Sequence, residues 1–471
     1  MSNTLKALLA AMACTGCTMA PRYTAPAPPV PRSFPGQPAA ASGPAAAELD
    51  WKEFYADPRL QRVLALALAN NRDLRVAALN TEKAGDYYRI QRAALLPTVN
   101  ADGTYYRGSL PAGEAGLAPG IGVSVGISAW EMDFFGRLNS LRQEAQQNYL
   151  ATEQAQRAAQ VSLLAQVANG YLVLAGDLEA LKLAEATAAS QGTTYGLTQR
   201  RFQLGAASEI DARRAQISLE SARVDLASYT RMVALDRSTL DLLVGATVPP
   251  ELVAESLSGL TPLREDFAVG LPSEVLLRRP DILMAEDQLK AANADIGAAR
   301  AALFPSITLT TTAGTYGSSL NEMFRPGSNY WLLYPQINLP IFDFGSRRAS
   351  LRVSETQREI FVAQYEKAIQ TAFKEVRDAL AQRETLRQQA LAQAALAQAA
   401  EATYRLAKAR FDVGMDGSLS VLDAQRTFNS AQQGLIALRQ AELGNWVTLY
   451  KVLGGGTQAA NPSPAPPKTH T

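Results

Sequence analysis

The chain has 471 residues, with 45 Lys and Arg against 44 Asp and Glu and a formal net charge of +1. This balance leaves no basic footprint, so we expect no nucleic-acid partner. The only histidine is His470, near the C-terminal end, which excludes a Ser-His-Asp triad or a His-based zinc site inside the fold. No pair of carboxylates has a spacing that indicates acid–base catalysis. We therefore expect a protein that is not an enzyme and that uses no cofactor or metal.

The N-terminus reads as a bacterial lipoprotein signal. The apolar segment Leu5–Ala13 ends just before Cys14 and Cys17, the two cysteines of the chain. A Cys-x-x-Cys pair can also bind zinc or act in redox chemistry, but no second pair of ligands accompanies this one. A secretory segment followed by Gly16-Cys17 instead predicts acylation of Cys17. We predict a signal peptide over 1–16 and a lipid-anchored, Pro- and Ala-rich tether over 17–57.

The mature chain is internally duplicated. Arg92–Val99 (RAALLPTV) returns as Arg300–Ile307 (RAALFPSI) at an offset of 208 residues, and Leu197–Gly205 returns as Leu406–Gly414 at an offset of 209. A drift of one residue over this distance indicates two copies of one unit of about 200 residues, far longer than a solenoid repeat. We predict one repeat over 58–260, a second over 261–457, and a disordered tail over 458–471.

Each half contains a very long helical stretch. Residues 120–248 and 341–461 lack proline and are rich in Ala, Leu, Gln, Glu and Arg, which are strong helix formers. A helix from Arg137 to about Leu204 would be ~100 Å long at 1.5 Å per residue. Within it, coiled-coil spacing is shown by Leu164, Val167, Tyr171, Leu174, Leu178 and Leu181.

Each half also contains a pair of strands. Apolar residues alternate with Gly and Ser over Ile121–Ala129, which is typical of a lipid-facing barrel strand. Its partner is the segment from Val99 to Tyr105, and the second half repeats the pair at 307–313 and 331–341. A sheet with open edges cannot lie in lipid, and bacterial barrels start at about eight strands. Four strands per chain therefore predict closure by further copies of the chain.

Together these patterns resemble the TolC-type outer membrane efflux proteins, and specifically the lipidated NodT family, over nearly the whole mature chain. The motifs that carry the resemblance are Gly16-Cys17-x-x-x-Pro21-x-Tyr23-x-x-Pro26, the doubled Arg-Ala-Ala-Leu-(Leu/Phe)-Pro, Leu276-Leu-Arg-Arg279-Pro280-Asp281-Ile282, Phe342-Asp-Phe-Gly345 and the paired Arg-Phe-x-x-Gly turns. Pro280-Asp281 also has a local interpretation, as proline and an acid in the first turn of a helix.

The resemblance implies a mostly α fold with a β-barrel: a homotrimer with a twelve-stranded barrel in the outer membrane of a Gram-negative bacterium and a long α-helical barrel in the periplasm. Such a protein is the passive exit duct of a tripartite pump. Its partners are an inner-membrane resistance-nodulation-division (RND) transporter, a periplasmic adaptor protein and outer-membrane lipids.

The resemblance also implies where function concentrates. Two paired turns form the periplasmic tips that meet the adaptor, and their residues are Arg201, Phe202, Gly205, Arg410, Phe411 and Gly414. Glycine at these positions also suits an ordinary helix C-terminus.

A periplasmic gate is predicted just beyond the tips. Val421-Leu422-Asp423 resembles a family segment in which aspartates line the narrowest constriction, and in the other repeat Asp211 aligns with Ser420. Three copies of each carboxylate would form a ring that selects for cations. For Asp211, a solvated acid at a helix N-terminus is the alternative.

Two other functions fit part of the sequence. A type I protein-secretion duct has the same fold, although the lipid anchor and the Arg-Pro-Asp-Ile element favour efflux. A lipid-anchored structural coiled coil would explain the helices but not the strand pairs. The cargo does not follow from the sequence.

Overall fold

The computed structural model describes residues 18–31, 46–107, 120–261, 263–264 and 277–456. The chain forms two compact units, each built from segments of both halves. Of the described residues, the first unit contains those up to 28 and those within 79–154 and 283–367, and the second contains those within 29–78, within 155–282 and from 368 onward. The predicted signal peptide, Cys17, the tail over 458–471 and His470 lie outside the described residues.

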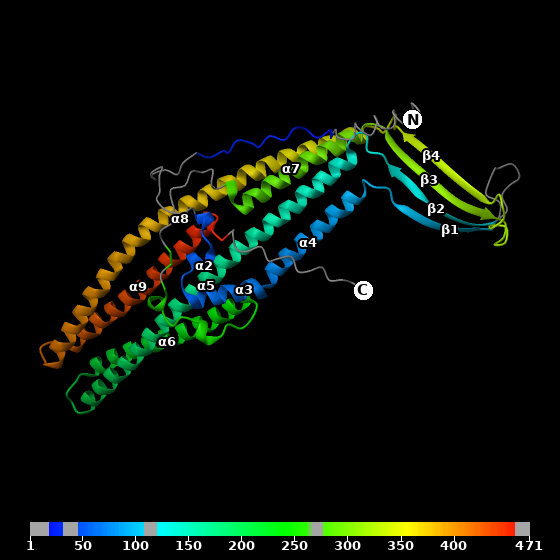
Figure 1. Cartoon of the computed structure of the whole chain (residues 1–471). Coiled ribbons are helices and arrows are strands. Elements are labelled where there is room, and N and C mark those ends of the chain that lie inside the picture. The colour runs from blue at the N-terminus through cyan, green and yellow to red at the C-terminus, as the bar shows by residue number, and fades with distance from the viewer. Residues whose placement is uncertain (1–17, 32–45, 108–119, 262, 265–276, 457–471) are drawn as a thin grey trace. The chain divides into compact units, whose positions relative to one another are not determined.

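The helices repeat in length as well as in order (Figure 1). Helices α4 and α7 have 22 residues each, and α5 and α8 have 67 each. The bounds are η1 Ala46–Glu48, α2 Trp51–Phe54, α3 Pro58–Asn70, α4 Arg72–Ala93, α5 Arg137–Gln203, α6 Glu209–Val244, η2 Pro250–Leu252, η3 Leu257–Gly259, α7 Pro280–Ala301, α8 Ser346–Asp412 and α9 Ser418–Val452.

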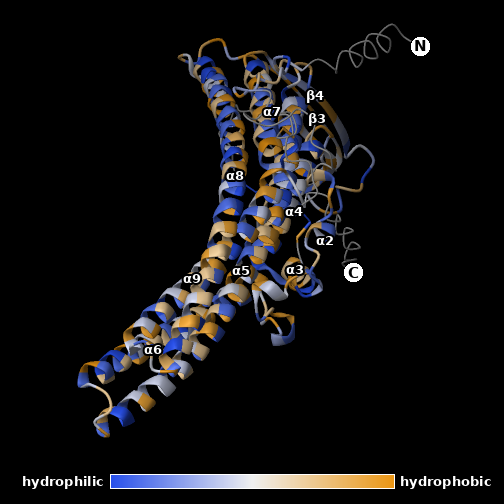
Figure 2. Cartoon of the chain, turned by 90° about the vertical axis from the view of Figure 1, so that its left-hand side faces the viewer, coloured by the Kyte–Doolittle hydropathy of each residue, from blue (hydrophilic) through white to orange (hydrophobic). Residues whose placement is uncertain are grey.

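The long helix predicted from Arg137 is confirmed as α5. Four of its coiled-coil positions are almost fully buried: Leu164, Val167, Tyr171 and Leu174. One stretch of α5 is long and apolar enough to cross a membrane, but more than half of that stretch is buried within the chain. Packing therefore accounts for its apolar character. Along α8, hydrophobic and hydrophilic residues are interspersed (Figure 2).

The four strands form one antiparallel sheet in the order β1-β2-β3-β4. Their bounds are β1 Val99–Tyr106, β2 Gly120–Glu131, β3 Ser306–Gly317 and β4 Asn329–Asn338. The two predicted strand pairs are confirmed, and β2 also pairs with β3, which joins the two repeats. The outer edges of β1 and β4 have no neighbouring strand among the described residues.

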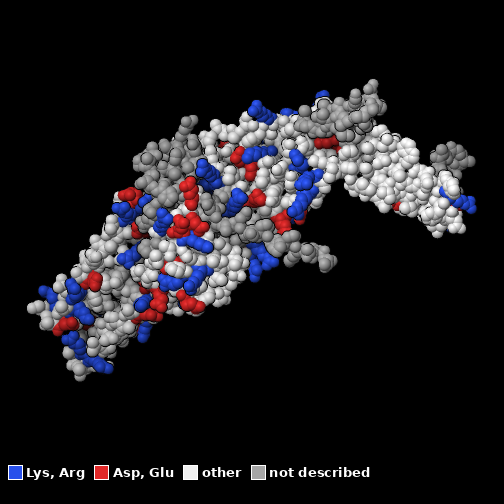
Figure 3. Space-filling view, viewed as in Figure 1, with Lys and Arg blue, Asp and Glu red and all other residues white. Residues whose placement is uncertain are grey.

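The register places the predicted apolar positions on one face of the sheet. Two transverse rows run Val99–Ile127–Thr311–Leu333 and Ala101–Val125–Ala313–Trp331. Because side chains alternate between faces, all members of these rows share a face. This face is open to its surroundings, with Trp331 79% and Leu333 57% exposed. The sheet carries few charged side chains in the view of Figure 3.

Two details of the predicted strands are wrong. The alternation does not extend to Ala129, because a bulge lies between Ile127 and Trp130 and Ala129 has a positive φ of 49°. The extra residue shifts the side-chain alternation beyond this point. Strand β4 also stops at Asn338, before the predicted position 341, because Pro340 has no N–H for a ladder and restricts the preceding residue.

The second unit has an aromatic core that includes part of the predicted tether. Trp51, Phe54 and Tyr55 are at most 5% exposed, and the Phe54 ring stacks on Tyr450 with centroids 4.0 Å apart. The Tyr450 hydroxyl donates to the Leu49 carbonyl at 2.7 Å. The tether assigned to 17–57 is therefore too long, since burial of three aromatic side chains offsets the entropy of ordering this segment.

Candidate functional site: the two hairpin tips

The turns that end α5 and α8 have the same backbone geometry. Gly205 has φ +71° and Gly414 has φ +79°. In the first turn, Ala206 N–H donates to the Arg201 carbonyl at 2.7 Å and Gly205 N–H to the Phe202 carbonyl at 2.9 Å. The second turn repeats both bonds at 2.9 Å. This is a Schellman motif, so each glycine is required for its left-handed conformation.

The helices that follow these turns start differently. Ser208 caps α6 in a capping box with Asp211, whose Oδ2 accepts from the Ser208 backbone N–H at 3.4 Å and from the Ser208 hydroxyl at 2.6 Å. At the corresponding start of α9, Gly417 has no side-chain cap. The duplicated tips therefore differ in chemistry although they share a backbone.

Asp211 also joins the two tips. Its Oδ1 accepts a hydrogen bond from the Ser418 hydroxyl at 3.0 Å, across 207 residues of sequence. Hydrogen bonds from Ser208 and then Ser418 lower the pKa of Asp211, so this carboxylate stays ionised at neutral pH. The interpretation of Asp211 as a helix N-terminal acid explains the hydrogen bonds of Oδ2 to Ser208. It does not explain the hydrogen bond that Oδ1 accepts from Ser418.

The two matching arginines have different partners. Arg410 makes two hydrogen bonds to Asp416 in its own turn, at 2.7 and 3.0 Å, which lower the pKa of Asp416. The first turn has Ala207 where the second has Asp416. Arg201 instead lies 5.8 Å from the centre of the Phe411 ring, a cation–π contact between the tips.

Asp423 lies on α9 with its side chain 62% exposed, and its Oδ1 is 2.6 Å from Arg426. The same two residues line a groove of about 410 Å³ together with Arg214 and Asp225 of α6. Acidic and basic side chains both gather at the hairpin ends (Figure 3). Each chain therefore presents Asp423 beside basic side chains at an open surface, and it does not bring Asp423 against Asp211.

Sequence reasoning did not single out several residues of the tips: Ser208, Arg214, Asp416, Ser418 and Arg426. The sequence pattern could have indicated two of them, Arg214 and Arg426. At the repeat offset of 209, Asp423 corresponds to Arg214, and Arg426 follows Asp423 by three positions on one helix face. The bond between Ser418 and Asp211 had no local signal, because it joins different repeats.

The Arg-Pro-Asp motif forms a buried node elsewhere in the second unit. Arg279 is 8% exposed and donates to Asp281 at 2.7 and 3.0 Å, to Glu375 at 2.8 Å and to the Val452 carbonyl at 3.0 Å. It thereby fixes the start of α7 to α8 and to the end of α9. The predicted helix start at Pro280 is confirmed.

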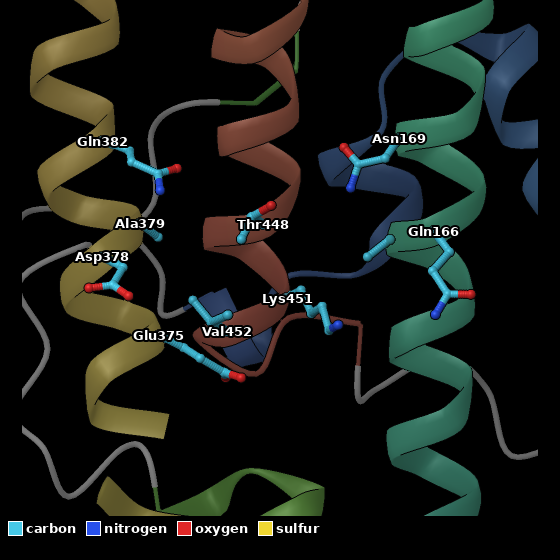
Figure 4. Close-up of a pocket in the computed structure, with 10 residues that line it drawn as sticks. Gln166, Asn169, Glu375, Asp378, Ala379, Gln382, Thr448, Lys451 and Val452 are labelled. Atoms are coloured by element: carbon cyan, nitrogen blue, oxygen red, sulfur yellow. The ribbon is translucent and has the colours of Figure 1, made fainter. Parts of the chain in front are cut away.

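A polar pocket of about 270 Å³ lies beside this node, between α5, α8 and α9 (Figure 4). Gln166 and Asn169 come from α5, Glu375 and Asp378 from α8, and Lys451 from α9. Asp378 is paired with Lys374 at 2.5 Å, and Glu375 is held by Arg279. Within the described ranges, no group of three or more His, Cys, Asp or Glu is placed to hold a metal ion.

Comparison with known proteins agrees with this architecture. The sequence profile of the outer membrane efflux protein family matches residues 63–246 and 271–455. The chain belongs to this family. A relative in Pseudomonas putida, the antibiotic efflux pump outer membrane protein ArpC, is 46% identical over 450 residues, which cover 94% of this chain and 93% of that protein.

Solved structures give the same result for the fold. A membrane protein from Pseudomonas aeruginosa has a TM-score of 0.85 and 40% identity, covering 93% of this chain and 98% of that one. The open state of the Neisseria gonorrhoeae MtrE outer membrane channel has a TM-score of 0.84 and 36% identity, covering 94% and 99%. The chain is thus an outer membrane efflux protein with a TolC-like fold, and not an enzyme.

Proposed function

We propose that three copies of this efflux protein form the exit duct of a tripartite RND-type pump. The observation that carries the proposal is the four-stranded sheet, which exposes an apolar face while the outer edges of β1 and β4 have no strand partner among the described residues. Edges of this kind cannot remain open in lipid. Three copies would join β4 of one chain to β1 of the next and close a barrel of twelve strands.

The first repeat supplies a second argument for assembly. Helix α4 has no buried residue, and four of its apolar side chains are 53 to 61% exposed: Val76, Leu79, Tyr87 and Ile90. Its counterpart α7, by contrast, contains Ile282, Leu289 and Ile296, each at most 2% exposed. Several exposed apolar side chains along one helix are typical of an interface. A neighbouring copy would cover it.

The hairpin tips would meet the periplasmic adaptor. Leu204, Val413 and Met415 are 83, 71 and 70% exposed at the two turns. Apolar side chains at the end of a hairpin suit contact with another protein. Arg201, Phe202, Gly205, Arg410, Phe411 and Gly414 would shape this surface, with the two glycines setting the turns. The transporter and adaptor would supply the cargo, which we propose to be small organic molecules including antibiotics.

Asp423 would line the periplasmic constriction, and Asp211 would add a second carboxylate from the start of α6 in each copy. Three exposed carboxylates around a narrow opening attract cations. Arg426 would limit their mutual repulsion, and the Ser418–Asp211 bond would hold the tips of one chain together. Acylation of Cys17 would anchor the duct to the membrane, and this cysteine lies outside the described residues.

Single-channel conductance in planar bilayers tests the proposal, with wild type compared with Asp423→Ala. We expect a small cation-selective conductance that rises in the variant, because the constriction loses three charges and their contacts with Arg426. Glu220→Ala is the matched control. Glu220 pairs with Arg223 at 3.0 Å on α6, with the same three-residue spacing and similar exposure, but outside the proposed gate.

The outcomes separate the parts of the proposal. Equal conductance in wild type and Asp423→Ala would retain the duct and reject the gate. An equal rise in Glu220→Ala would show that loss of any surface acid loosens the tips. A folded oligomer that forms no channel would favour the structural coiled coil, and transport of a polypeptide would favour type I secretion.

A further inference from the structure

The segment that follows Cys17 in the sequence is packed on α5 and α7 within the first unit by contacts of several kinds. We define residues 18–23 as the strap. Thr18 contacts Ser140 of α5, with their hydroxyl oxygens 3.0 Å apart. Because the Ser140 hydroxyl donates to the Gly136 carbonyl at 2.6 Å, Thr18 is the donor in this pair. The Thr18 oxygen in turn accepts from the backbone N–H of Ala20 at 3.2 Å.

Helix α7 provides two further contacts. The Asn293 side-chain amide donates to the Pro21 carbonyl at 2.7 Å. The Tyr23 hydroxyl donates to Glu286 at 3.2 Å, and the Lys290 ammonium lies 5.8 Å from the centre of the Tyr23 ring. The strap is thus held through its side chains and its backbone, at both ends and in the middle.

A glycine on α7 makes room for the strap. A Cβ at Gly297 would lie 2.7 Å from the backbone nitrogen of Ala20, 2.9 Å from its Cα and 2.7 Å from the Ser140 hydroxyl oxygen. Any side chain at this position would therefore displace the strap. Glycine is among the least favourable residues inside a helix, so its presence in α7 has a packing reason.

The duplication shows that this seat is not a general property of the scaffold. We define the strap seat as Ser140, Glu286, Lys290, Asn293 and Gly297. At the repeat offset of 208, its four α7 positions correspond to Ala78, Glu82, Gly85 and Arg89 of α4. None of the four residues is retained. One repeat has the seat and the other lacks it, as expected for a chain with a single N-terminus.

We propose that the strap seat fixes the N-terminal end of the mature chain on α5 and α7, so that the acyl anchor predicted at Cys17 is held at one place on the protein instead of on a free tether. Thr18 directly follows Cys17 in sequence, so a seated strap leaves one peptide link between the anchor and the first contact. The consequence for the anchor rests on the proposed acylation. The seating itself can be tested without it.

Limited trypsin digestion of the purified oligomer in detergent measures the seating. Cleavage after Arg22 creates a new N-terminus at Tyr23, which mass spectrometry distinguishes from cleavage after Arg32 as an internal reference. A protease must accommodate its substrate in an extended form, so a seated strap protects Arg22. We expect Gly297→Val to accelerate cleavage after Arg22 about tenfold or more relative to cleavage after Arg32, and Asn293→Ala to accelerate it less.

Gly196→Val is the matched control, because Gly196 lies within α5 and a Cβ there meets nothing within 4 Å. Its cleavage ratio should equal that of wild type. Asn293→Ala keeps the test valid if Gly297→Val does not fold. Cys17→Ser, which cannot be acylated, should remain protected at Arg22.

Two results would overturn the proposal. Unchanged protection in both Gly297→Val and Asn293→Ala would show that the seat does not hold the strap. Loss of protection in Cys17→Ser with the seat intact would show that the acyl chains and the micelle, not the seat, order the segment. Neither result depends on channel conductance, so failure here is separable from failure of the duct.

Discussion

The Arg279 node should contribute strongly to stability, because one buried guanidinium holds three helices. Arg279→Ala removes two hydrogen bonds to Asp281, one to Glu375 and one to the Val452 carbonyl. Breaking a fully buried ion pair costs about 3–5 kcal/mol. Here the Arg279 side chain is 9% exposed but both carboxylates are 40% exposed and can be rehydrated. We therefore expect a loss of about 2–3 kcal/mol, below the fully buried value.

A double-mutant cycle isolates the bond between α7 and α8. Arg279→Ala, Glu375→Ala and the double variant should give a coupling energy of about 1–2 kcal/mol, within the range for residues in direct contact. The assay is guanidinium unfolding in detergent, followed by far-UV circular dichroism. Arg279→Lys should recover only part of the loss, because a lysine keeps the charge but not the planar fork that binds two carboxylates.

The neighbouring pair on α8 is the control for this cycle. Lys374 and Asp378 are 2.5 Å apart, but their side chains are 74 and 51% exposed. The same cycle on this pair should give a coupling energy well below that of Arg279–Glu375, because solvent screens exposed charges. If the Arg279–Glu375 coupling were as small as that of Lys374–Asp378, the inference that burial makes Arg279 a structural node would be refuted.

Three further predictions concern the helices and their ends. Gly414→Ala should destabilise the protein by about 1–2 kcal/mol, because φ is +79° there. Gly196→Ala in the interior of α5 should instead stabilise it by up to about 1 kcal/mol, because alanine is the better helix former. Equal shifts in the melting temperature of the two variants would contradict this. Ser208→Ala should lower the free energy of unfolding by about 1 kcal/mol, because it removes the side-chain cap of α6. Gly417→Ser should raise it by about 0.3 kcal/mol, because it adds a cap to α9. Unfolding midpoints measure both changes. Burial, followed by the hydrogen bond and charge of Asp236, raises the pKa of Asp177 to about 7. Because the folded state then binds the proton more tightly than the unfolded state, stability should fall as pH rises from about 4 to 7 and change little above this. Asp177→Asn should reduce the difference in unfolding free energy between pH 5 and pH 8. An unchanged difference would show that Asp177 does not cause this pH dependence. Burial, followed by the charge of Asp295, also raises the pKa of Glu144 to about 7. Glu144 should therefore account for part of the pH dependence of stability that remains in Asp177→Asn.

The candidate site divides into a part that sequence could predict and a part that it could not. The turn glycines at 205 and 414 were predictable, because a glycine after a long helix indicates a left-handed C-terminal turn. The partners of Asp211 and Arg201 were not, because Ser418 and Phe411 lie in the other repeat. The strap was not predictable either, since its Pro- and Ala-rich composition indicates a tether, whereas its contacts depend on Gly297 and Asn293 far along the chain.

The sequence by itself determined the elements and their repetition: a very long helical stretch in each half, two strand pairs, and one apolar face across the sheet. These features are local, because helix and strand periodicity place side chains on a given face within a few residues. Only the tertiary structure decided which duplicated positions diverge in role. Arg410 binds Asp416 while Arg201 makes a cation–π contact with Phe411, and α7 seats the strap while α4 stays exposed. The reason is physical: two segments with the same backbone acquire different contacts when packing brings different neighbours to them, and those neighbours lie far away in sequence.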